Sequence, residues 1–397
     1  MKILLLTTLY PEETRPDLRQ DTKAIHYFAR QWVKDGHEVL VIHIYLHPLR
    51  DLFHRKKKFG ISLSINEGVK VVLLEKQLMI PHARRLLRFQ QKATSTIINR
   101  FLSKEFFSPD VLIAHFPTFL TGVVDRIDIK CPRIAVLHYA DAKTLKKIND
   151  RKKIKEMFSK YNGIGFRGKH IQKVYQKYES GHKNFFMVYS GVPPNFITQE
   201  NYKYKTIQDK SQEFLKIVYV GNLIPLKNVD ITIKALHKVA KDVDFKFTII
   251  GDGPELKNLK MLVSKLGLEE RVTFTGKLTR DQALSIMRES DLFIMVSSPE
   301  TFGLVYLEAM SQGCIVIGSK GEGIDGIIKD GYNGFLVSPH NQEELAQKIY
   351  LISNMEEERK KTVLKNAYNT VSRMTDKDMA EKYIERITEI VNMYSGE

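Results

Sequence analysis

The chain has 397 residues, of which 43% are hydrophobic and 27% are charged. This length favours more than one compact domain, and the composition excludes a disordered or fibrous chain. Apolar runs such as IAVL and FTII are far shorter than the ~20 residues that a transmembrane helix needs. The formal net charge of +16 indicates an anionic partner, such as nucleic acid, an anionic membrane surface or a polyphosphate.

The chain begins with the pattern of a parallel sheet. Residues 1–8 (MKILLLTT) are a continuous apolar run, which predicts a strand buried on both faces. We favour this over a signal peptide, because no small-residue cleavage site follows. A helix is expected over Thr22–Lys34 and a second strand over residues 37–44, which together form a right-handed crossover unit. The polar loop Leu9–Arg19 is expected to be a lid, a substrate loop or a plain surface connection.

A basic stretch and a basic helix follow. Residues 46–65 are basic and irregular, residues 68–76 predict a third strand, and a helix is expected from Pro81 onward. Its expected apolar stripe is formed by Leu86, Phe89, Ala93 and Ile97. Arginines and a lysine lie beside this stripe. Such a helix usually packs on its own sheet, but the cations also suit a helix that lies on anionic lipid headgroups.

Two further strands, PDVLIAHF and CPRIAVLHYADA, carry His115 and His138 at their ends. Residues at the carboxyl ends of parallel strands point into the ligand crevice of such sheets. A single histidine is usually structural, but two at successive strand ends favour a site. Asp141 is placed to orient or charge-balance the His138 imidazole. Cys131 and Cys314 lie in apolar surroundings and are expected to be free buried thiols.

The strand and helix pattern begins again in the second half, where glycine-rich turns follow successive strands. Gly221-Asn222 is followed by Lys227, and the next turns are Gly251–Gly253, Thr275–Lys277 and Gly321–Asp325. Glycine lets the backbone approach a ligand closely, and Lys227 offers a mobile cation for a diphosphate. Because glycine-rich turns recur at the ends of successive strands, they predict a single ligand-binding edge of the sheet.

The segment SSPETFGLVYLEAMSQG carries Glu300 and Glu308. It is preceded by an apolar strand, and it predicts a tight turn and then a helix over Gly303–Gln312 that ends at Gly313. The amino terminus of this helix favours a phosphate. The two carboxylates can accept hydrogen bonds from hydroxyls that lie on either side of that phosphate in the same ligand. A nucleotide-sugar has this arrangement of groups. A capped helix with a solvated glutamate is the plainer alternative.

The order of these motifs resembles retaining GT-B glycosyltransferases of the family 4 type (glycosyl transferases group 1), in particular those of bacterial cell-surface polysaccharides. The first half matches in DGHEVLVI, DVLIAHF, VLHYADA and VYSGV. The second half matches more specifically, in VYVGNLIPLKNVD, IIGDGPE, VTFTGKL, SSPETFGLVYLEAMSQG and DGYNGFLV. The resemblance covers essentially the whole chain.

The resemblance implies an α/β fold with two Rossmann-like, doubly wound parallel-sheet domains that face each other across a cleft. Residues 1–195 would form the acceptor-binding domain and residues 213–375 the nucleotide-sugar-binding domain, with residues 196–212 as the linker. Residues 376–397 would form a helix that crosses back to the first domain.

The resemblance also implies roles for individual residues. Lys227 and Asn222 would hold the donor diphosphate, Glu300 the hydroxyls of the sugar, Glu308 those of the ribose, and His138 would lie near the transferred sugar. The implied catalytic residues are His138, Lys227 and Glu300. Thr275–Leu278 would frame the base. The implied donor-binding residues are Gly221, Asn222, Lys227, Gly251, Gly276, Lys277, Leu278, Glu300, Thr301, Phe302, Gly303, Leu304 and Glu308.

The chain departs from the family pattern at three places. Many relatives have arginine at the position of Asn222, so that Lys227 or another basic residue must carry more of the diphosphate charge. The loop after the first strand reads PEETRPDLRQD and lacks the usual glycines. The late glycine loop reads GEGIDGI in place of the commoner Gly-x-Pro-Glu pattern, and Asp325 is given no role beyond the shape of this loop.

The activity implied is transfer of a sugar, with retention of anomeric configuration, from a UDP- or GDP-sugar to a glycan or a polyprenyl-diphosphate-linked glycan. Such reactions build capsule, exopolysaccharide and O-antigen (lipopolysaccharide) chains. No metal is expected, because cationic groups can stabilise the leaving diphosphate. We expect a cytoplasmic protein, peripheral on the inner face of the membrane, that docks on anionic lipid through Arg84, Arg85, Arg88 and Lys92.

Three alternatives stay open. A GT-B-fold nucleotide-sugar epimerase would share the donor site but would need no acceptor. A nucleic-acid-binding protein would explain the net charge, but the basic runs lack interleaved aromatic residues, and no nucleic acid partner is expected. A dinucleotide dehydrogenase would need a Gly-x-Gly-x-x-Gly turn after the first strand, which the sequence lacks.

Overall fold

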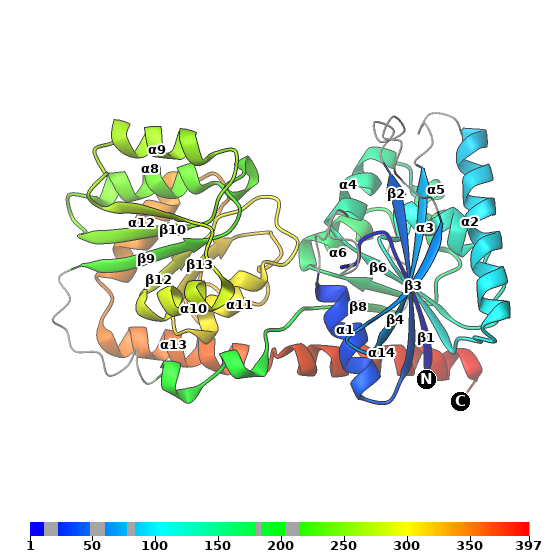
Figure 1. Ribbon diagram of the computed structural model, residues 1–397. Coiled ribbons are helices and arrows are strands. Elements are labelled where there is room, and N and C mark those ends of the chain that lie inside the picture. The colour runs from blue at the N-terminus through cyan, green and yellow to red at the C-terminus, as the bar shows by residue number, and fades with distance from the viewer. Residues whose placement is uncertain are drawn as a thin grey trace. The chain divides into compact units, whose positions relative to one another are not determined.

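A computed structural model describes most of the chain. The described residues are 1–11, 23–47, 60–77, 84–179, 181, 184–202 and 214–396. This part of the chain divides into two compact units, which Figure 1 shows with their elements labelled. Unit 1 consists of Met1–Arg167, Ile171–Tyr189 and Asp376–Glu397. Unit 2 consists of Gly168–His170 and Ser190–Thr375.

Unit 1 is built on a sheet with the strand order β3-β4-β2-β1-β5-β6-β7-β8. Its strands are β1 (Lys2–Thr7), β2 (Glu38–His47), β3 (Ile61–Asn66), β4 (Val69–Gln77), β5 (Val111–His115), β6 (Arg133–Leu137), β7 (Gly163–Phe166) and β8 (Phe185–Met187). Neighbouring strands pair in parallel, except that β3 runs antiparallel to β4. The central strands β1 and β5 are buried along almost their whole length, as their apolar sequences predict.

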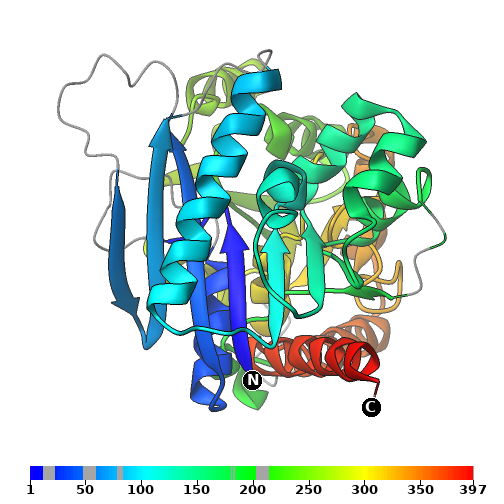
Figure 2. The same ribbon diagram turned by 90° about the vertical axis from the view of Figure 1, so that its right-hand side faces the viewer.

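Helices cover both faces of this sheet. They are α1 (Ala24–Lys34), α2 (Arg84–Lys104), α3 (Pro117–Val124), α4 (Tyr139–Ile148), α5 (Arg151–Phe158), α6 (Lys169–Gln176) and α14 (Asp376–Ser395). Figure 2 shows α2 across the face turned to the viewer. The last helix, α14, packs on α1. Trp32 Nε1 donates to the carbonyl oxygen of Ala380 at 3.0 Å. The rings of Phe28 and Tyr383 lie edge to face, with 5.3 Å between their centroids. The end of the chain thus completes the core of its first part.

Two expectations for unit 1 are wrong. The stretch predicted to be irregular contains β3, whose Ile61, Leu63 and Ile65 side chains are exposed at the edge of the sheet. On α2, the buried face holds Ile98 and Leu102 together with two polar residues, whereas Phe89 is 69% exposed.

The polar residues on the buried face of α2 explain the second error. Thr94 and Ser95 are buried, and their hydroxyls donate to the carbonyl oxygens of Gln90 and Lys92, at 2.8 and 2.9 Å. Because the helix backbone accepts their hydrogen bonds, these two side chains face the core at little cost. A search for an apolar stripe therefore finds the buried face only in part: Ile97 packs against the core, as predicted, whereas Phe89 is exposed. Pro81, the predicted start of the helix, lies outside the described residues.

Unit 2 is built on a parallel sheet with the strand order β11-β10-β9-β12-β13-β14. Its strands are β9 (Leu215–Val220), β10 (Phe245–Ile250), β11 (Val272–Gly276), β12 (Leu292–Ile294), β13 (Ile315–Ser319) and β14 (Phe335–Val337). Its helices are η2 (Pro194–Phe196), η3 (Pro225–Lys227), α8 (Val229–Val239), α9 (Leu256–Lys265), α10 (Arg280–Glu289), α11 (Leu304–Ser311), α12 (Gln342–Ser353) and α13 (Glu357–Val371). In chain order this is the 3-2-1-4-5-6 arrangement of dinucleotide-binding folds. In unit 2 the strand order reverses between β9 and β12.

Cys131 and Cys314 are both buried free thiols, as expected. Burial raises the pKa of the Cys131 thiol to about 11, so that it is protonated at neutral pH. Among the described helices, none is both long and apolar enough to cross a bilayer.

Candidate active site

The candidate site lies where the strand order of unit 2 reverses. In doubly wound sheets, ligands bind at the carboxyl ends of the strands on either side of this point, because the loops diverge there and leave a crevice. The loops after β9 and β12 are joined by two hydrogen bonds. The Ser298 N–H donates to the Leu226 carbonyl at 2.9 Å, and Asn228 Nδ2 donates to the Val296 carbonyl at 2.8 Å. These loops therefore form one continuous wall.

An ion pair between Lys227 and Glu300 spans this wall. Lys227 Nζ donates to Glu300 Oε2 at 2.6 Å, and the two side chains are 22% and 12% exposed. The Glu300 carboxylate also accepts from Ser297 Oγ at 3.1 Å and from the Thr301 N–H at 3.1 Å. Several donors thus fix its orientation. The structure brings together the lysine and the glutamate that the sequence assigns to the diphosphate and the sugar.

Glycines bring the ends of the neighbouring strands close together. The Gly221 N–H donates to the Ile250 carbonyl at 3.0 Å, and the Gly251 N–H donates to the Gly276 carbonyl at 2.9 Å. A Cβ atom on Gly251 would lie 1.9 Å from the Gly221 carbonyl oxygen, so that only glycine fits there. The ends of β9, β10 and β11 therefore form one edge. At this edge, Asn222 and Lys277 are exposed, and Leu278 is half-buried.

Helix α11 (Leu304–Ser311) begins four residues after Glu300, close to the predicted bounds Gly303–Gln312. Gly303 precedes it with a positive φ of 76°, which glycine adopts without strain, and Gly313 ends it with a φ of 81°. The first backbone N–H groups of this helix follow Gly303. A helix start of this kind attracts an anion, because its N–H groups and the helix dipole both favour negative charge.

Glu308 has a partner that the sequence did not reveal. Arg280, at the start of α10, donates to Glu308 Oε1 through Nη2 at 2.5 Å and through Nε at 3.1 Å. The Arg280 guanidinium also lies over the ring of Phe196, 4.6 Å from its centroid. Arg280 is far from Glu308 in sequence, and no motif marks it, so pattern analysis could not find this pair.

The histidines predicted at successive strand ends form a pair in unit 1. His115 Nδ1 and His138 Nε2 are 2.9 Å apart, and the His138 ring stacks on Phe116 with 3.8 Å between centroids. Burial lowers the pKa of both imidazoles well below 6.5, and the positive charge of Arg167 acts in the same direction. At neutral pH this is therefore a hydrogen-bonded pair of uncharged rings.

The sequence suggested that Asp141 orients or charge-balances the His138 imidazole, but the structure directs its carboxylate to other groups. Its carboxylate accepts from the His138 backbone N–H at 2.8 Å and from Thr118, through the N–H at 3.0 Å and the hydroxyl at 2.6 Å. Burial raises the pKa of Asp141 to about 6. The residue holds the backbone at the start of α4, and its effect on the ring is indirect. The error arose because the spacing of three residues also fits a helix cap.

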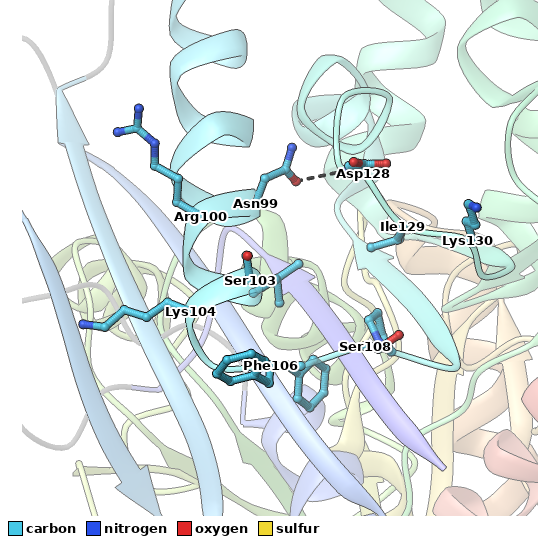
Figure 3. Close-up of a pocket in the computed structure, with 12 residues that line it drawn as sticks. Asn99, Arg100, Ser103, Lys104, Phe106, Ser108, Asp128, Ile129 and Lys130 are labelled. Atoms are coloured by element: carbon cyan, nitrogen blue, oxygen red, sulfur yellow. Dashed lines mark hydrogen bonds between the residues drawn. The ribbon is translucent and has the colours of Figure 1, made fainter.

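A separate cavity of about 990 Å³ lies at the end of α2 in unit 1 (Figure 3). Residues that precede β5 and β6 line it, among them Phe106, which is 90% exposed, and Lys130. The Asp128 N–H donates to Asn99 Oδ1 at 3.1 Å beside it. The cavity is at the amino ends of these strands, opposite the edge that carries His115 and His138. It is therefore not the site that the motifs predict.

The chain is similar in sequence to known glycosyltransferases. The family model described as glycosyl transferases group 1 matches residues 201–370. An uncharacterized glycosyltransferase of Methanocaldococcus jannaschii is 30% identical over 288 residues, which cover 71% of this chain and 76% of that protein. N-acetyl-alpha-D-glucosaminyl L-malate synthase of Bacillus anthracis is 36% identical over 141 residues, which cover 35% of this chain and 36% of that protein.

Solved structures show the same fold. HepE from Anabaena in complex with UDP has a TM-score of 0.69 at 19% identity, and the match covers 98% of this chain and 100% of HepE. Sucrose-phosphate synthase from Thermosynechococcus elongatus has a TM-score of 0.71 at 14% identity, over 98% and 99% of the two chains. The two parallel-sheet units and these neighbours show that the chain has the GT-B fold. With the M. jannaschii relative, they show that the chain belongs to the glycosyl transferases group 1 family.

Proposed function

We propose that this glycosyltransferase takes its sugar from a UDP- or GDP-sugar and transfers it, with retention of anomeric configuration, to a glycan or a polyprenyl-diphosphate-linked glycan. The observation that carries the proposal is the pairing of Lys227 with Glu300 where the strand order of unit 2 reverses. A cation for a diphosphate and a carboxylate for sugar hydroxyls meet there, next to the start of α11. Structures of HepE with UDP and with UDP-glucose support the choice of donor class.

The proposed reaction breaks the bond between the anomeric carbon and the diphosphate oxygen. Positive charge develops on the sugar ring and negative charge on the leaving diphosphate. Lys227 and the first N–H groups of α11 stabilise the leaving group by preorganised electrostatics. The acceptor hydroxyl attacks the same face of the sugar and forms the new glycosidic bond. Its proton passes to the departing diphosphate, so that the products are the glycoside and the nucleoside diphosphate.

The carboxylates would bind the two ends of the donor. When the diphosphate takes over Lys227, the Glu300 carboxylate becomes available to hydroxyls of the sugar. Glu308 would accept from the ribose hydroxyls while Arg280 holds its Oε1. His138, as a neutral imidazole, would lie near the transferred sugar without placing a second charge beside the developing cation. We propose that the reaction needs no metal, and turnover that survives EDTA would support this.

We further propose that the protein is cytoplasmic and binds the inner face of the membrane through α2, as an enzyme of capsule, exopolysaccharide or O-antigen synthesis would. The segment Arg84–Lys104 contains six cationic residues and no acidic residue. Arg88 and Lys92 are exposed, and so is Phe89, which gives this helix an apolar side chain among cations. The side chains of Arg84 and Arg85 lie outside the described residues.

A screen of nucleotide-sugars for thermal stabilisation tests the donor class most simply. At least one UDP- or GDP-sugar should raise the melting temperature, and that compound should release its nucleoside diphosphate in the presence of a suitable acceptor. Product analysis with the donor alone separates transfer from epimerisation, since an epimerase converts the donor without an acceptor. If no nucleotide-sugar or nucleoside diphosphate stabilises the protein, the proposed donor class is wrong.

A further inference from the structure

A glutamate in the loop after β13 contacts the segment that carries Glu300. The loop reads GEGIDG over residues 321–326, and Glu322 is its acidic residue next to the site. Glu322 Oε1 accepts from Ser298 Oγ at 2.7 Å, and Glu322 Oε2 accepts from the backbone N–H of Glu300 at 2.8 Å. Both oxygens of this carboxylate are thus directed at the segment Ser298–Glu300.

The backbones of the two loops are joined as well. The Gly323 N–H donates to the Glu300 carbonyl oxygen at 3.0 Å. A Cβ atom on Gly323 would lie 2.2 Å from the Thr301 carbonyl oxygen, so that no larger residue fits between the loops. The N–H and the carbonyl of Glu300 are therefore both held by neighbouring residues of one loop, Glu322 and Gly323.

These contacts fix the backbone from which the Glu300 side chain projects. Hydrogen bonds to an ionised carboxylate are stronger than those between neutral groups, so that Glu322 is an effective anchor for a partly buried segment. The donors on the Glu300 carboxylate, Lys227 Nζ and Ser297 Oγ, then determine the direction of the side chain. A change in the backbone position at Glu300 would misplace the carboxylate even with those donors present.

We propose that Glu322 is a positioning residue of the glycosyltransferase: it holds the segment Ser298–Thr301 so that the Glu300 carboxylate meets the donor sugar. It acts through Glu300 and does not itself contact the substrate. This inference rests on the proposed function of the site, in which Glu300 binds the transferred sugar. Glu308 and the nucleotide end of the donor do not depend on Glu322. A displacement of about 1 Å in a positioning group can lower turnover about 10²-fold.

Two substitutions separate positioning from other roles. Glu322→Ala removes both acceptors. Glu322→Gln keeps both hydrogen bonds, since its oxygen can accept from the Glu300 N–H while its amide donates to the Ser298 hydroxyl. Glu343→Gln is the matched control, because Glu343 is an exposed carboxylate on α12 of the same unit, where it pairs with Lys238.

The first measurement is hydrogen–deuterium exchange of the ligand-free proteins, and it needs no donor. Peptides that contain the Glu300 amide should exchange at least tenfold faster in Glu322→Ala. In Glu322→Gln and in the Glu343→Gln control they should exchange within about threefold of the wild-type rate. Unchanged exchange in Glu322→Ala would overturn the inference, whatever the donor proves to be.

The second measurement is binding of UDP and turnover of UDP-glucose by the same proteins. Glu322→Ala should lower kcat 10- to 100-fold and leave the Kd for UDP within threefold, and Glu322→Gln should restore most of kcat. Equal losses in the Ala and Gln variants would instead indicate a direct role for the charge, and no loss in either would overturn the inference. A wild-type protein that neither binds UDP nor turns over UDP-glucose would count against this donor in the proposed function, and the exchange result would still decide the role of Glu322.

Discussion

At the scale of single residues, Lys227 and Glu300 determine what the site can do. Their 2.6 Å ion pair provides a cation and a carboxylate within one partly buried wall. Opposite charges in this setting attract more strongly than on an exposed surface, yet either partner can exchange the other for a ligand group. The pair therefore keeps the charges in place in the free protein.

Replacing Lys227 with alanine removes the side chain assigned to the leaving diphosphate. Turnover should fall by about 10²–10³-fold, because a preorganised charge at the leaving group contributes that much in comparable sites. Steady-state kinetics with the donor found in the nucleotide-sugar screen measures this effect. Lys234→Ala is the control, since Lys234 lies on α8 and pairs with Asp230. Normal turnover in Lys227→Ala would rule out the leaving-group role.

The two glutamates should affect different steps. Glu308→Ala removes the proposed ribose contact and should weaken nucleoside diphosphate binding about tenfold, or about 1.4 kcal/mol. Glu300→Ala removes the sugar contact and should lower kcat while the nucleotide Kd stays within threefold. Calorimetry with UDP and GDP, together with turnover, separates the two effects. Equal loss of nucleotide affinity in both variants would contradict the division of roles.

The histidine pair in unit 1 predicts a dependence of stability on pH. Burial lowers the folded-state pKa of His115 and His138 well below 6.5, whereas in the unfolded chain both titrate near 6.5. As the pH falls through 6.5, the unfolded state gains protons that the folded state does not bind, and stability is lost. The full contribution is present above that pH.

Melting temperatures at pH 7.5 and pH 5.5 measure this effect. The decrease should be larger in the wild-type protein than in His138→Gln, which lacks one of the two titrating rings. His237→Gln serves as control, because His237 is exposed on α8. The same decrease in wild-type protein and His138→Gln would show that the buried pair does not titrate in this way.

The proximity of some residues of the site could be inferred from the sequence, whereas that of others could not. Lys227, Glu300 and the glycines lie in loops that follow buried parallel strands, and the carboxyl ends of such strands always share one edge. Their proximity could therefore be inferred from the sequence. Arg280 and Glu322 lie on other loops, and their contacts depend on where those loops fold back. Asp141 illustrates the reverse case, in which a short spacing is compatible with two hydrogen-bonding arrangements.

At the scale of elements, β3 and α2 show where periodicity fails. The edge strand β3 alternates polar Ser62 and Ser64 with exposed isoleucines and a leucine, and it follows a basic segment that masked its pattern. In α2 the hydroxyls of Thr94 and Ser95 bond to the helix itself, which allows them to be buried. The alternation of buried strands and helices predicted both sheets, because parallel strands buried on both faces are continuous apolar runs that the sequence shows directly.

Helix α2 also provides the prediction at this scale. Reversing the charge of Arg88 and Lys92 to glutamate should reduce binding to liposomes that contain anionic lipid at low salt, since each cation contributes about 1 kcal/mol near such a surface. Sedimentation with the vesicles measures the effect. The control reverses Lys257 and Lys265, two exposed lysines on α9. Wild-type protein that does not sediment with anionic vesicles at low salt would rule out the docking role of α2.

At the scale of the whole molecule, the chain is shared between two doubly wound units, and each has its own sheet and its own reversal of strand order. The residues proposed to bind the donor belong to unit 2, whereas the histidine pair belongs to unit 1. Residues 376–397 return to unit 1, where α14 covers Phe28 and Trp32. The net charge of +16 is a property of the whole chain and does not identify the partner.

The central claim is that the nucleotide part of the donor binds in unit 2 where its strand order reverses. Hydrogen–deuterium exchange with and without saturating UDP or GDP tests this claim most directly. Binding should slow exchange in peptides that span residues 221–228 and 298–308, and in Glu308→Ala the same protection should need about tenfold more nucleotide. Protection confined to the cavity beside Phe106 in unit 1, or protection of unit 2 that leaves both segments unchanged, would contradict the claim.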